Sequence, residues 1–181
     1  NLNLYINESV LIPRFETEEI VEMVILELKK YGKKDLSILD IGTGSGNLLF
    51  AILKEYPMKV KAYGVDISEK ALDVARINAD KLKYFFHPDT QVHLLKNDRC
   101  DGVNEQFDLI VTNPPYIMEA NDRCKVHRNV ERFEPHLALY LEDEEYFLWF
   151  DELFDQVSER LCPGGIFIME GHEDHLEQLK R

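Results

Sequence analysis

The chain has 181 residues, of which 45% are hydrophobic and 30% are charged, a composition typical of one soluble globular domain. Its net charge of -13 disfavours a broad affinity for nucleic acid, because phosphates require a basic surface. No apolar run approaches the ~20 residues of a membrane span. The three scattered cysteines favour free thiols in a reducing compartment over a disulfide framework or a zinc site: Cys100, Cys124 and Cys162.

The first 15 residues contain no basic region followed by an apolar one, so they do not resemble a secretory signal peptide. We therefore expect a cytoplasmic protein, or an organellar one if the source is eukaryotic. The chain begins without a methionine, and we expect it to be a fragment of a longer protein.

Apolar strand patterns alternate with helical patterns along most of the chain. Residues 16–31 have helical apolar spacing, with acids in the first turn and lysines in the last, and Gly32 is a suitable stop. Further regions with helical spacing are 47–56, 68–85 (capped by Ser68), 144–161 (ended by Pro163, Gly164 and Gly165) and 172–181. Short runs predict strands over 37–42, 60–68, 91–98, 107–113 and 166–170. This alternation predicts an α/β fold with a mainly parallel sheet covered by helices on both faces.

The longest stretch without a clear pattern, roughly residues 117–144, follows the strand predicted over 107–113. Long loops at the carboxyl end of a parallel sheet are more often functional than idle. A basic cluster lies within it, and this cluster is either a solvated loop or a surface that faces a partner: Arg123, Lys125, His127, Arg128 and Arg132.

A glycine-rich loop, "LDIGTGSGN" (residues 39–47), lies where the first predicted strand turns into a helix. Ligands of open α/β sheets bind at such strand ends, and alternate glycines let the backbone turn sharply and approach a ligand. The dinucleotide fingerprint is not met, because Asn47 stands in place of its third glycine, and no P-loop motif is present. With Asp40 directly before the glycines, the spacing suits S-adenosylmethionine better than NAD. The alternative is a tight turn that binds nothing.

Polar residues also end the next two predicted strands. Asp66 can accept hydrogen bonds from both hydroxyls of a ribose, or it can be an acid favoured at the start of a helix. The glycine loop upstream favours the ribose role. Asn97 and Asp98 can meet an adenine amino group, although both are also ordinary turn residues.

Six segments follow one another in a recognisable order and spacing: "VLIPRFETEEIVE", "LDIGTGSGN", "GVDIS", "FDLIVTNPPYI", "FEPHLAL" and "LCPGGIFIMEGH". Together they resemble the HemK/PrmC family of release factor glutamine methyltransferases, over nearly the whole chain. The resemblance implies a Rossmann-like class I methyltransferase that uses S-adenosylmethionine and no metal. Its expected substrate is the side-chain amide of the glutamine in a Gly-Gly-Gln tripeptide of a peptide chain release factor. "NPPY" alone is shared with enzymes that methylate adenine N6 in DNA or guanine in RNA, so a nucleic-acid amino-group methyltransferase is the alternative.

The motifs and the resemblance together indicate the residues of the site. Cofactor binding is expected for Asp40, Gly42, Thr43, Gly44, Ser45, Gly46, Asp66, Ile67, Asn97, Asp98 and Asn113. Substrate contact is expected for Arg14, Glu16, Thr17, Asn113, Pro114, Pro115 and Tyr116. Catalysis is assigned to Asn113, Pro114 and Tyr116.

The chain departs from the family in three places. Phe15 stands where the family has a proline between Arg14 and Glu16, which is expected to alter a lid formed by residues 1–15. Compared with the family, we expect the N-terminal helical domain that docks the release factor to be absent from this fragment. We also expect the strand pair that the family adds after the strand at 166–170 to be truncated. We expect residues 1–181 to form a single monomeric catalytic domain whose partner is a release factor, not a membrane or a nucleic acid.

Asn113 and two prolines directly follow a buried strand, and the chemistry of amide methylation explains them. An amide nitrogen is a poor nucleophile, because its lone pair is delocalised into the carbonyl group. The Asn113 side-chain oxygen and the Pro114 carbonyl can each accept one N–H of the target, which orients its nitrogen and stabilises the developing positive charge. Proline makes these acceptors rigid, and Tyr116 offers a ring face to the flat amide. The alternative is a rigid turn with a core tyrosine.

Three other groups of residues carry weaker indications. Glu170, His172, Glu173 and His175 lack the H-E-x-x-H spacing, so a polar helix start is expected there instead of a metal site. The aromatic residues of 144–161 are expected to pack in the core and the helix: Tyr146, Phe147, Trp149, Phe150 and Phe154. Glu134 and Pro135 match the family segment, but their chemistry does not follow from the sequence.

Overall fold

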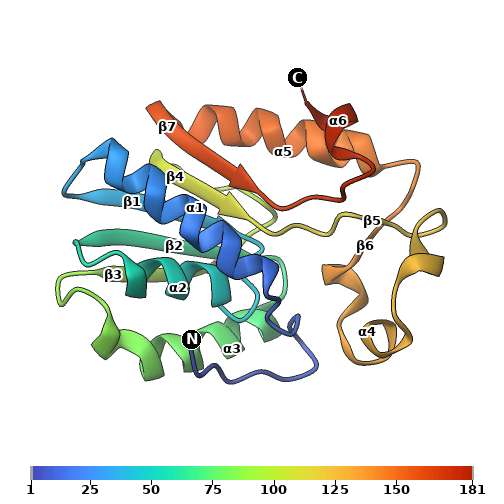
Figure 1. The fold of residues 1–181 in the computed structure, drawn as a ribbon, viewed down its shortest axis with the longest axis horizontal. Helices are drawn as coiled ribbons and strands as arrows, with labels where there is room; N and C mark the ends of the chain where they lie inside the picture. Colours follow the sequence, from blue (N-terminus) through green and yellow to red (C-terminus); the bar gives the residue numbers. More distant parts are fainter. Residues whose placement is uncertain (1, 181) are drawn as a thin grey trace.

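The structure is a computed structural model that describes residues 2–180, and it contains one central sheet flanked by helices (Figure 1). The sheet has five parallel strands in the order β3-β2-β1-β4-β7. These strands are β1 (Leu36–Ile41), β2 (Val60–Asp66), β3 (Gln91–Lys96), β4 (Phe107–Thr112) and β7 (Leu161–Met169). The α-helices are α1 (Glu16–Tyr31), α2 (Asn47–Glu55), α3 (Glu69–Leu82), α4 (Arg128–Phe133), α5 (Tyr146–Arg160) and α6 (Leu176–Leu179). The predicted α/β fold with a mainly parallel sheet is confirmed.

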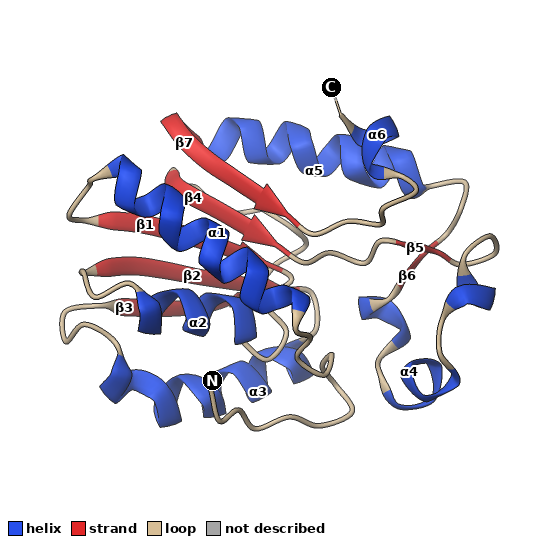
Figure 2. Cartoon of the chain, viewed as in Figure 1, coloured by secondary structure: helices blue, strands red, loops and turns tan. Residues whose placement is uncertain are grey.

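Helices cover both faces of the sheet, because its central strands are apolar on both sides (Figure 2). Leu36 and Ile38 of β1 belong to a buried cluster with α1 and α2 on one face. Leu39 and Ile41 belong to a second cluster with α5 on the other face. Successive residues of a strand point to opposite faces, so a strand buried on both sides is a nearly continuous apolar run, as "LSILDI" is.

Two predicted helix boundaries are confirmed in detail. Gly32 ends α1 in the left-handed conformation, with φ +67°, and its N–H donates to the carbonyl of Leu28 at 3.2 Å. Ser68 caps α3, because its Oγ accepts a hydrogen bond from the backbone N–H of Ala71 at 3.3 Å.

The last strand begins earlier than the sequence predicts. β7 starts at Leu161, directly after α5, and therefore includes the Pro163–Gly165 segment that was expected to separate helix from strand. The pairing of β4 with β7 shifts register between Phe107 and Leu109, opposite this segment. β7 is at the edge of the sheet, where proline is tolerated, and Gly164 has the left-handed φ of +78° that such irregularities favour.

The stretch after β4 is more ordered than expected, and the prediction of an irregular loop over 117–144 is wrong. It contains α4, two 3₁₀ turns and a small parallel pair formed by β5 (Ile117–Met118) and β6 (Tyr140–Leu141). The 3₁₀ turns of the chain are η1 (Lys83–Phe85), η2 (Arg123–Lys125) and η3 (His136–Ala138). Elements this short contain too few residues to show a periodic pattern.

Two smaller differences concern the C-terminal part. The helix predicted over 172–181 is reduced to α6, and residue 181 lies outside the described residues. Phe147 was expected to pack in α5, but its side chain is exposed, whereas Tyr146 and Phe150 are fully buried. Within residues 2–180, no helix combines the length and the apolar character that a membrane crossing requires.

The strand order reverses beside β1, and this reversal places the site. The chain proceeds from β1 to β2 and β3 in one direction, then adds β4 and β7 on the other side of β1. The loops that leave the carboxyl ends of β1 and β4 therefore diverge to opposite sides. Open α/β sheets bind ligands in the crevice that forms at such a point.

Candidate active site

The glycine loop joins the end of β1 to the start of α2 and is tied to the end of β2. Gly42, Gly44 and Gly46 all have positive φ, at +69°, +55° and +80°. Between them, the backbone N–H of Thr43 donates to the carbonyl of Val65 at 2.9 Å. Gly46 has the least freedom to change, because a Cβ there would lie 2.1 Å from the ring of Phe50. The loop therefore has a fixed shape that requires glycine.

Asp66 lies at the end of β2 and holds the glycine loop from the side. One carboxylate oxygen accepts from the N–H of Gly44 at 2.9 Å, and the other accepts from the N–H of Ser68 at 2.8 Å. Burial raises the pKa of Asp66, and the two backbone hydrogen bonds act in the opposite direction. Each carboxylate oxygen has two lone pairs, so both oxygens can accept one further hydrogen bond from a ligand.

Asp40 is the most deeply buried acid of the loop, with a relative exposure of 1%. Its carboxylate accepts a hydrogen bond from the hydroxyl of Thr43 at 2.7 Å. Burial raises the pKa of Asp40 to about 7, against the effect of that hydrogen bond, and the nearby charge of Asp66 raises it further. A cationic group placed beside Asp40 would therefore favour its ionised form.

Two cavities open at this end of the sheet. The first has a volume of about 240 Å³ and is lined by the glycine loop, by Asp66 to Ser68, by Asn97 to Arg99 and by Asn113 to Pro115. The second has a volume of about 280 Å³ and is lined by residues that follow β4 and β7, among them Tyr116, Asp122, Glu170 and His172. Five residues line both cavities, which therefore adjoin one another: Leu11, Arg14, Asn113, Pro114 and Ala138.

The first cavity is covered by two segments that are far apart in the sequence. Residues 9–14 precede α1, and the residues from Pro135 to Leu141 that reach the cavity follow α4. Glu134 joins these segments, because its carboxylate accepts from the guanidinium of Arg14 at 2.7 Å and from the N–H of Ile12 at 3.3 Å. The Glu134 side chain is only 2% exposed. This role was not predicted from the sequence, because Arg14 and Glu134 are separated by 120 residues.

Asn113 lies at the junction of the cavities, held by the residue that follows β7. Its side-chain Nδ2 donates to one oxygen of Glu170 at 2.9 Å, and the hydroxyl of Tyr116 donates to the other oxygen at 2.8 Å. Burial raises the pKa of Glu170, while these two hydrogen bonds act to lower it. The carbonyl of Tyr116 accepts from the hydroxyl of Tyr146 at 3.2 Å, so the buried end of α5 supports the same turn.

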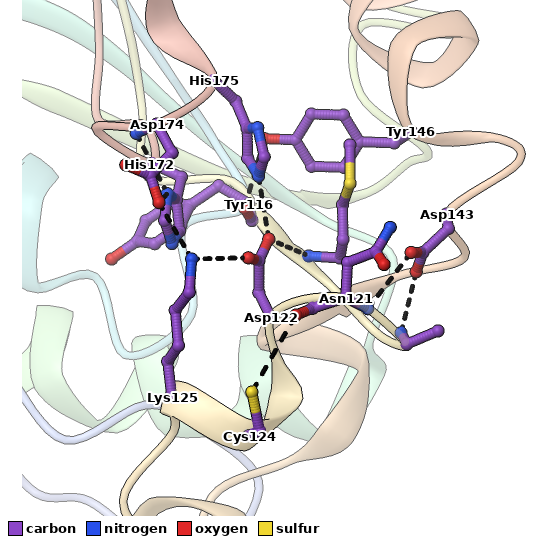
Figure 3. A network of polar contacts seen from close by, with 12 residues as sticks. Tyr116, Asn121, Asp122, Cys124, Lys125, Asp143, Tyr146, His172, Asp174 and His175 are labelled. Atoms are coloured by element: carbon purple, nitrogen blue, oxygen red, sulfur yellow. Dashed lines mark hydrogen bonds and ion pairs between the residues drawn. The ribbon is translucent and has the colours of Figure 1, made fainter.

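Asp122 and Lys125, which line the second cavity, belong to a network of polar contacts (Figure 3). Asp122, whose side chain is 5% exposed, accepts from His175 Nε2 at 2.8 Å and from Lys125 Nζ at 3.0 Å. Burial acts to raise the pKa of Asp122, but these hydrogen bonds lower it to about 2. Lys125 also donates to Asp174 at 2.8 Å. The network therefore ties the segment after β5 to the segment before α6.

The same contacts bear on the basic cluster. Arg123 pairs with Glu131 at 2.6 Å and with Glu119 at 3.5 Å, and Lys125 is held by Asp122 and Asp174. Arg123 and Lys125 are thus already paired with nearby acids. This supports the interpretation of a solvated loop over that of a surface that faces a partner.

The structure brings nearly all of the predicted site residues to the two cavities. The exceptions are Gly46, which lies against the ring of Phe50, and Glu16, which lies in the first turn of α1. Residues that the sequence did not suggest also line the first cavity, including Arg99 and Trp149, with the Arg99 guanidinium 5.3 Å from the Trp149 ring centre. Among residues 2–180, no group of three or more His, Cys, Asp or Glu side chains is placed to hold a metal ion.

Comparison with known proteins agrees with this geometry. The model of the family described as "Methyltransferase domain" matches residues 32–181. Release factor glutamine methyltransferases are similar to the chain: that of Flavobacterium psychrophilum is 38% identical over 172 residues, and that of Koribacter versatilis is 40% identical over 167 residues. These matches cover 93% and 91% of this chain but 58% and 56% of the relatives, so the chain spans little more than half of their length.

A solved structure gives the same result for the fold. The ribosomal protein L11 methylase of Lactobacillus delbrueckii subsp. bulgaricus superposes with a TM-score of 0.60 at 22% identity, covering 94% of this chain and 67% of that chain. The match over residues 32–181 establishes the family of the chain. The glycine loop, the acids at the strand ends and the reversal of strand order all lie within these residues. The chain belongs to the methyltransferase domain family.

Proposed function

We propose that the protein transfers a methyl group from S-adenosylmethionine to the side-chain amide of the glutamine in the Gly-Gly-Gln tripeptide of peptide chain release factors. The observation that carries the proposal is the position of Asn113 and Pro114, which line both cavities. A methyl donor in the first cavity and an amide in the second would meet at these two residues. The similarity to release factor glutamine methyltransferases, at 35% to 40% identity, supports this substrate.

Two features of the first cavity support S-adenosylmethionine as its ligand. Gly42 and Gly44 have the left-handed backbone that lets a ligand approach closely, and the acids Asp40, Asp66 and Asp98 line the cavity. We assign the ribose hydroxyls to the free lone pairs of Asp66 and the adenine to Asn97 and Asp98. The cofactor supplies an electrophilic methyl group on a positively charged sulfonium, and an acidic lining complements that charge.

Asn113 and Pro114 would orient the nitrogen that is methylated. The Asn113 side-chain oxygen accepts one N–H of the substrate amide, and the Pro114 carbonyl accepts the other. As the nitrogen bonds to the methyl group, the bond between that methyl and sulfur would break and leave S-adenosylhomocysteine. The nitrogen would acquire positive charge, and two fixed acceptors would stabilise this state more strongly than the neutral ground state. The acidity of the methylated nitrogen lets its proton leave afterwards, so no dedicated base is needed. Tyr116 bounds the second cavity and places its ring beside the flat amide.

A release factor as substrate places the activity where translation ends, in the cytoplasm or in the matrix of an organelle. The monomeric state and the exclusion of nucleic acid stay predictions.

The proposal is tested by incubating the protein with methyl-labelled S-adenosylmethionine and three separate acceptors. These are a release factor, the same release factor with glutamine replaced by glutamate in its Gly-Gly-Gln tripeptide, and a mixture of DNA and RNA. Label on the first acceptor alone supports the proposal. Label on nucleic acid would establish the alternative function, and equal label on both release factors would exclude the glutamine as the target.

We expect Asp66→Ala to weaken S-adenosylmethionine binding by about 1–3 kcal/mol, because buried hydrogen-bond partners are left unpaired. Calorimetric titration measures the affinity. The matched control is Asp73→Ala, because Asp73 is an exposed acid of α3 that pairs with Arg76 and lines neither cavity. An unchanged affinity in Asp66→Ala would remove this residue from the site.

We expect cofactor affinity to fall as the pH is lowered through about 7, because a positively charged ligand selects the ionised form of Asp40. Asp40 has a raised pKa in the free protein, so below about 7 it must lose its proton before the cofactor binds. The affinity should be about tenfold weaker at one pH unit below this pKa than well above it. Calorimetry over a pH series measures this slope, and Asp40→Asn should abolish it. A wild-type affinity that is independent of pH in this range contradicts the assignment.

A further inference from the structure

We propose that Glu170 is a positioning residue that fixes which end of the Asn113 side-chain amide faces the substrate. The inference rests on the proposed function of Asn113 and deepens it. An asparagine amide carries a donor group and an acceptor oxygen on two sides of nearly the same shape. Only the acceptor oxygen can receive an N–H of a substrate amide, and the donor side would repel it.

The pairing of β4 with β7 brings Glu170 to Asn113. Thr112 is the last residue of β4 and lies opposite Met169, the last residue of β7. The backbone N–H of Glu170 then donates to the carbonyl of Thr112 at 3.1 Å. β4 and β7 lie side by side in the sheet (Figure 1). The residues that follow them, Asn113 and Glu170, therefore leave the sheet together, and both line the second cavity.

The contacts of Glu170 leave the Asn113 amide one favourable orientation. An ionised carboxylate can only accept hydrogen bonds, and each oxygen of Glu170 already has a donor: Asn113 Nδ2 at 2.9 Å and the Tyr116 hydroxyl at 2.8 Å. Rotating the amide by half a turn would place its oxygen against the carboxylate and lose the hydrogen bond. The Nδ2 group of Asn113 therefore stays on Glu170, and its oxygen is turned away from the carboxylate, free to accept from a ligand.

Glu170 also accounts for the placement of Tyr116. The same carboxylate joins the first and last residues of the "NPPY" turn, so the turn is held at both ends by one group. The sequence suggested only a metal ligand or a polar helix start for this glutamate. Its contacts instead connect it to the two side chains on which the proposed chemistry depends.

Two substitutions of Glu170 separate its acceptor function from its shape. Glu170→Met keeps the length of the side chain but removes both acceptor oxygens. We expect it to slow single-turnover methylation of a release factor about 10- to 100-fold, as loss of a hydrogen bond to a charged group does. Glu170→Gln keeps one acceptor oxygen for Asn113, and its rate should lie between those of wild type and Glu170→Met. The control is Glu173→Gln, an exposed glutamate in the same segment, which should leave the rate unchanged.

A double-mutant cycle distinguishes positioning from a structural role. If Glu170 acts mainly through Asn113, Glu170→Met should slow the wild type clearly more than it slows an Asn113→Ala variant, and the remaining effect in that background reports its contact with Tyr116. A structural role would slow both backgrounds by the same factor, and that result overturns the inference. Nuclear magnetic resonance gives a readout independent of turnover, since the side-chain NH₂ protons of Asn113 should exchange with solvent faster in Glu170→Met.

The outcomes also separate this inference from the proposed function. If the wild-type protein methylates no release factor, the proposed function fails, while the exchange of the Asn113 NH₂ protons still tests the contact. If the wild type is active and Glu170→Met methylates at the wild-type rate, the function stands and the positioning role of Glu170 is wrong.

Discussion

Asn113→Ala is expected to slow methyl transfer about 10²–10³-fold, the usual effect of removing one preorganised group that stabilises developing charge. Its effect on cofactor affinity should be much smaller, because the contact strengthens only as positive charge builds on the substrate nitrogen. Single-turnover rates and calorimetric titration of S-adenosylmethionine on the same samples measure the two quantities.

Asn113→Asp is the matched variant, because it keeps an acceptor oxygen and changes the shape little. Its carboxylate would face the carboxylate of Glu170, which now accepts from Asn113 Nδ2 at 2.9 Å. Some methyl transfer should remain if the acceptor oxygen still faces the substrate. The lost hydrogen bond to Glu170 should keep the rate below that of wild type. Thermal melts identify a disturbed turn, which would lower stability and rate together. An Asn113→Ala variant that melts and methylates like wild type would exclude the proposed mechanism.

Gly46→Ala is expected to produce the largest loss of stability, about 2–5 kcal/mol, from a left-handed backbone and an overfilled space. A Cβ at this position would lie 2.1 Å from the ring of Phe50, which is fully buried and stacked on Phe86 with ring centres 5.8 Å apart. We therefore expect that the ring can yield to a new methyl group only by displacing its buried neighbours. Denaturant unfolding measures the change, and the melting temperature should fall by roughly 2–4 °C for each kcal/mol in a domain of this size.

Gly164→Ala supplies the matched control for that experiment. Gly164 has nearly the same φ, +78° against +80°, but a Cβ there would meet nothing within 4 Å. Its loss of stability should be only the backbone part, about 1–2 kcal/mol. The difference between the two variants then measures the contact with Phe50. Equal losses would show that the ring adapts and that the backbone conformation alone requires glycine.

The parts of the fold that the sequence predicts are those set by local patterns. The run "LSILDI" is apolar on both faces and is a central strand, and Ser68 and Gly32 mark helix ends by their own hydrogen bonding and backbone conformation. Pro163 misled the prediction of the last strand, because only the register of β4 with β7 shows that an edge irregularity can hold a proline.

The predictable parts of the site follow the same rule. The glycine loop and Asp66 are local motifs at strand ends, and the structure places them together. Glu134 and Glu170 could not be assigned from the sequence, because their partners are 120 and 57 residues away along the chain. Their functions depend on which strands become neighbours, and a single sequence does not state this. Glu16 was included as part of the segment that resembles the family, but it lines neither cavity. It acts on the site through its charge, which adds to the effect of burial in raising the pKa of Glu170.

The reversal of strand order also determines when each wall of the crevice can form as the chain folds. Contacts of the glycine loop are short in sequence, as between Gly44 and Asp66, which are 22 residues apart. β4 instead returns to β1 over a much longer separation, as in the hydrogen bond from Thr112 to Ile41, 71 residues apart. Because closing a longer loop costs more chain entropy, the β1–β2 contacts can precede the arrival of β4. On a chain emerging from the ribosome, the residues assigned to the ribose and the adenine, Asp66, Asn97 and Asp98, are thus synthesised before Asn113.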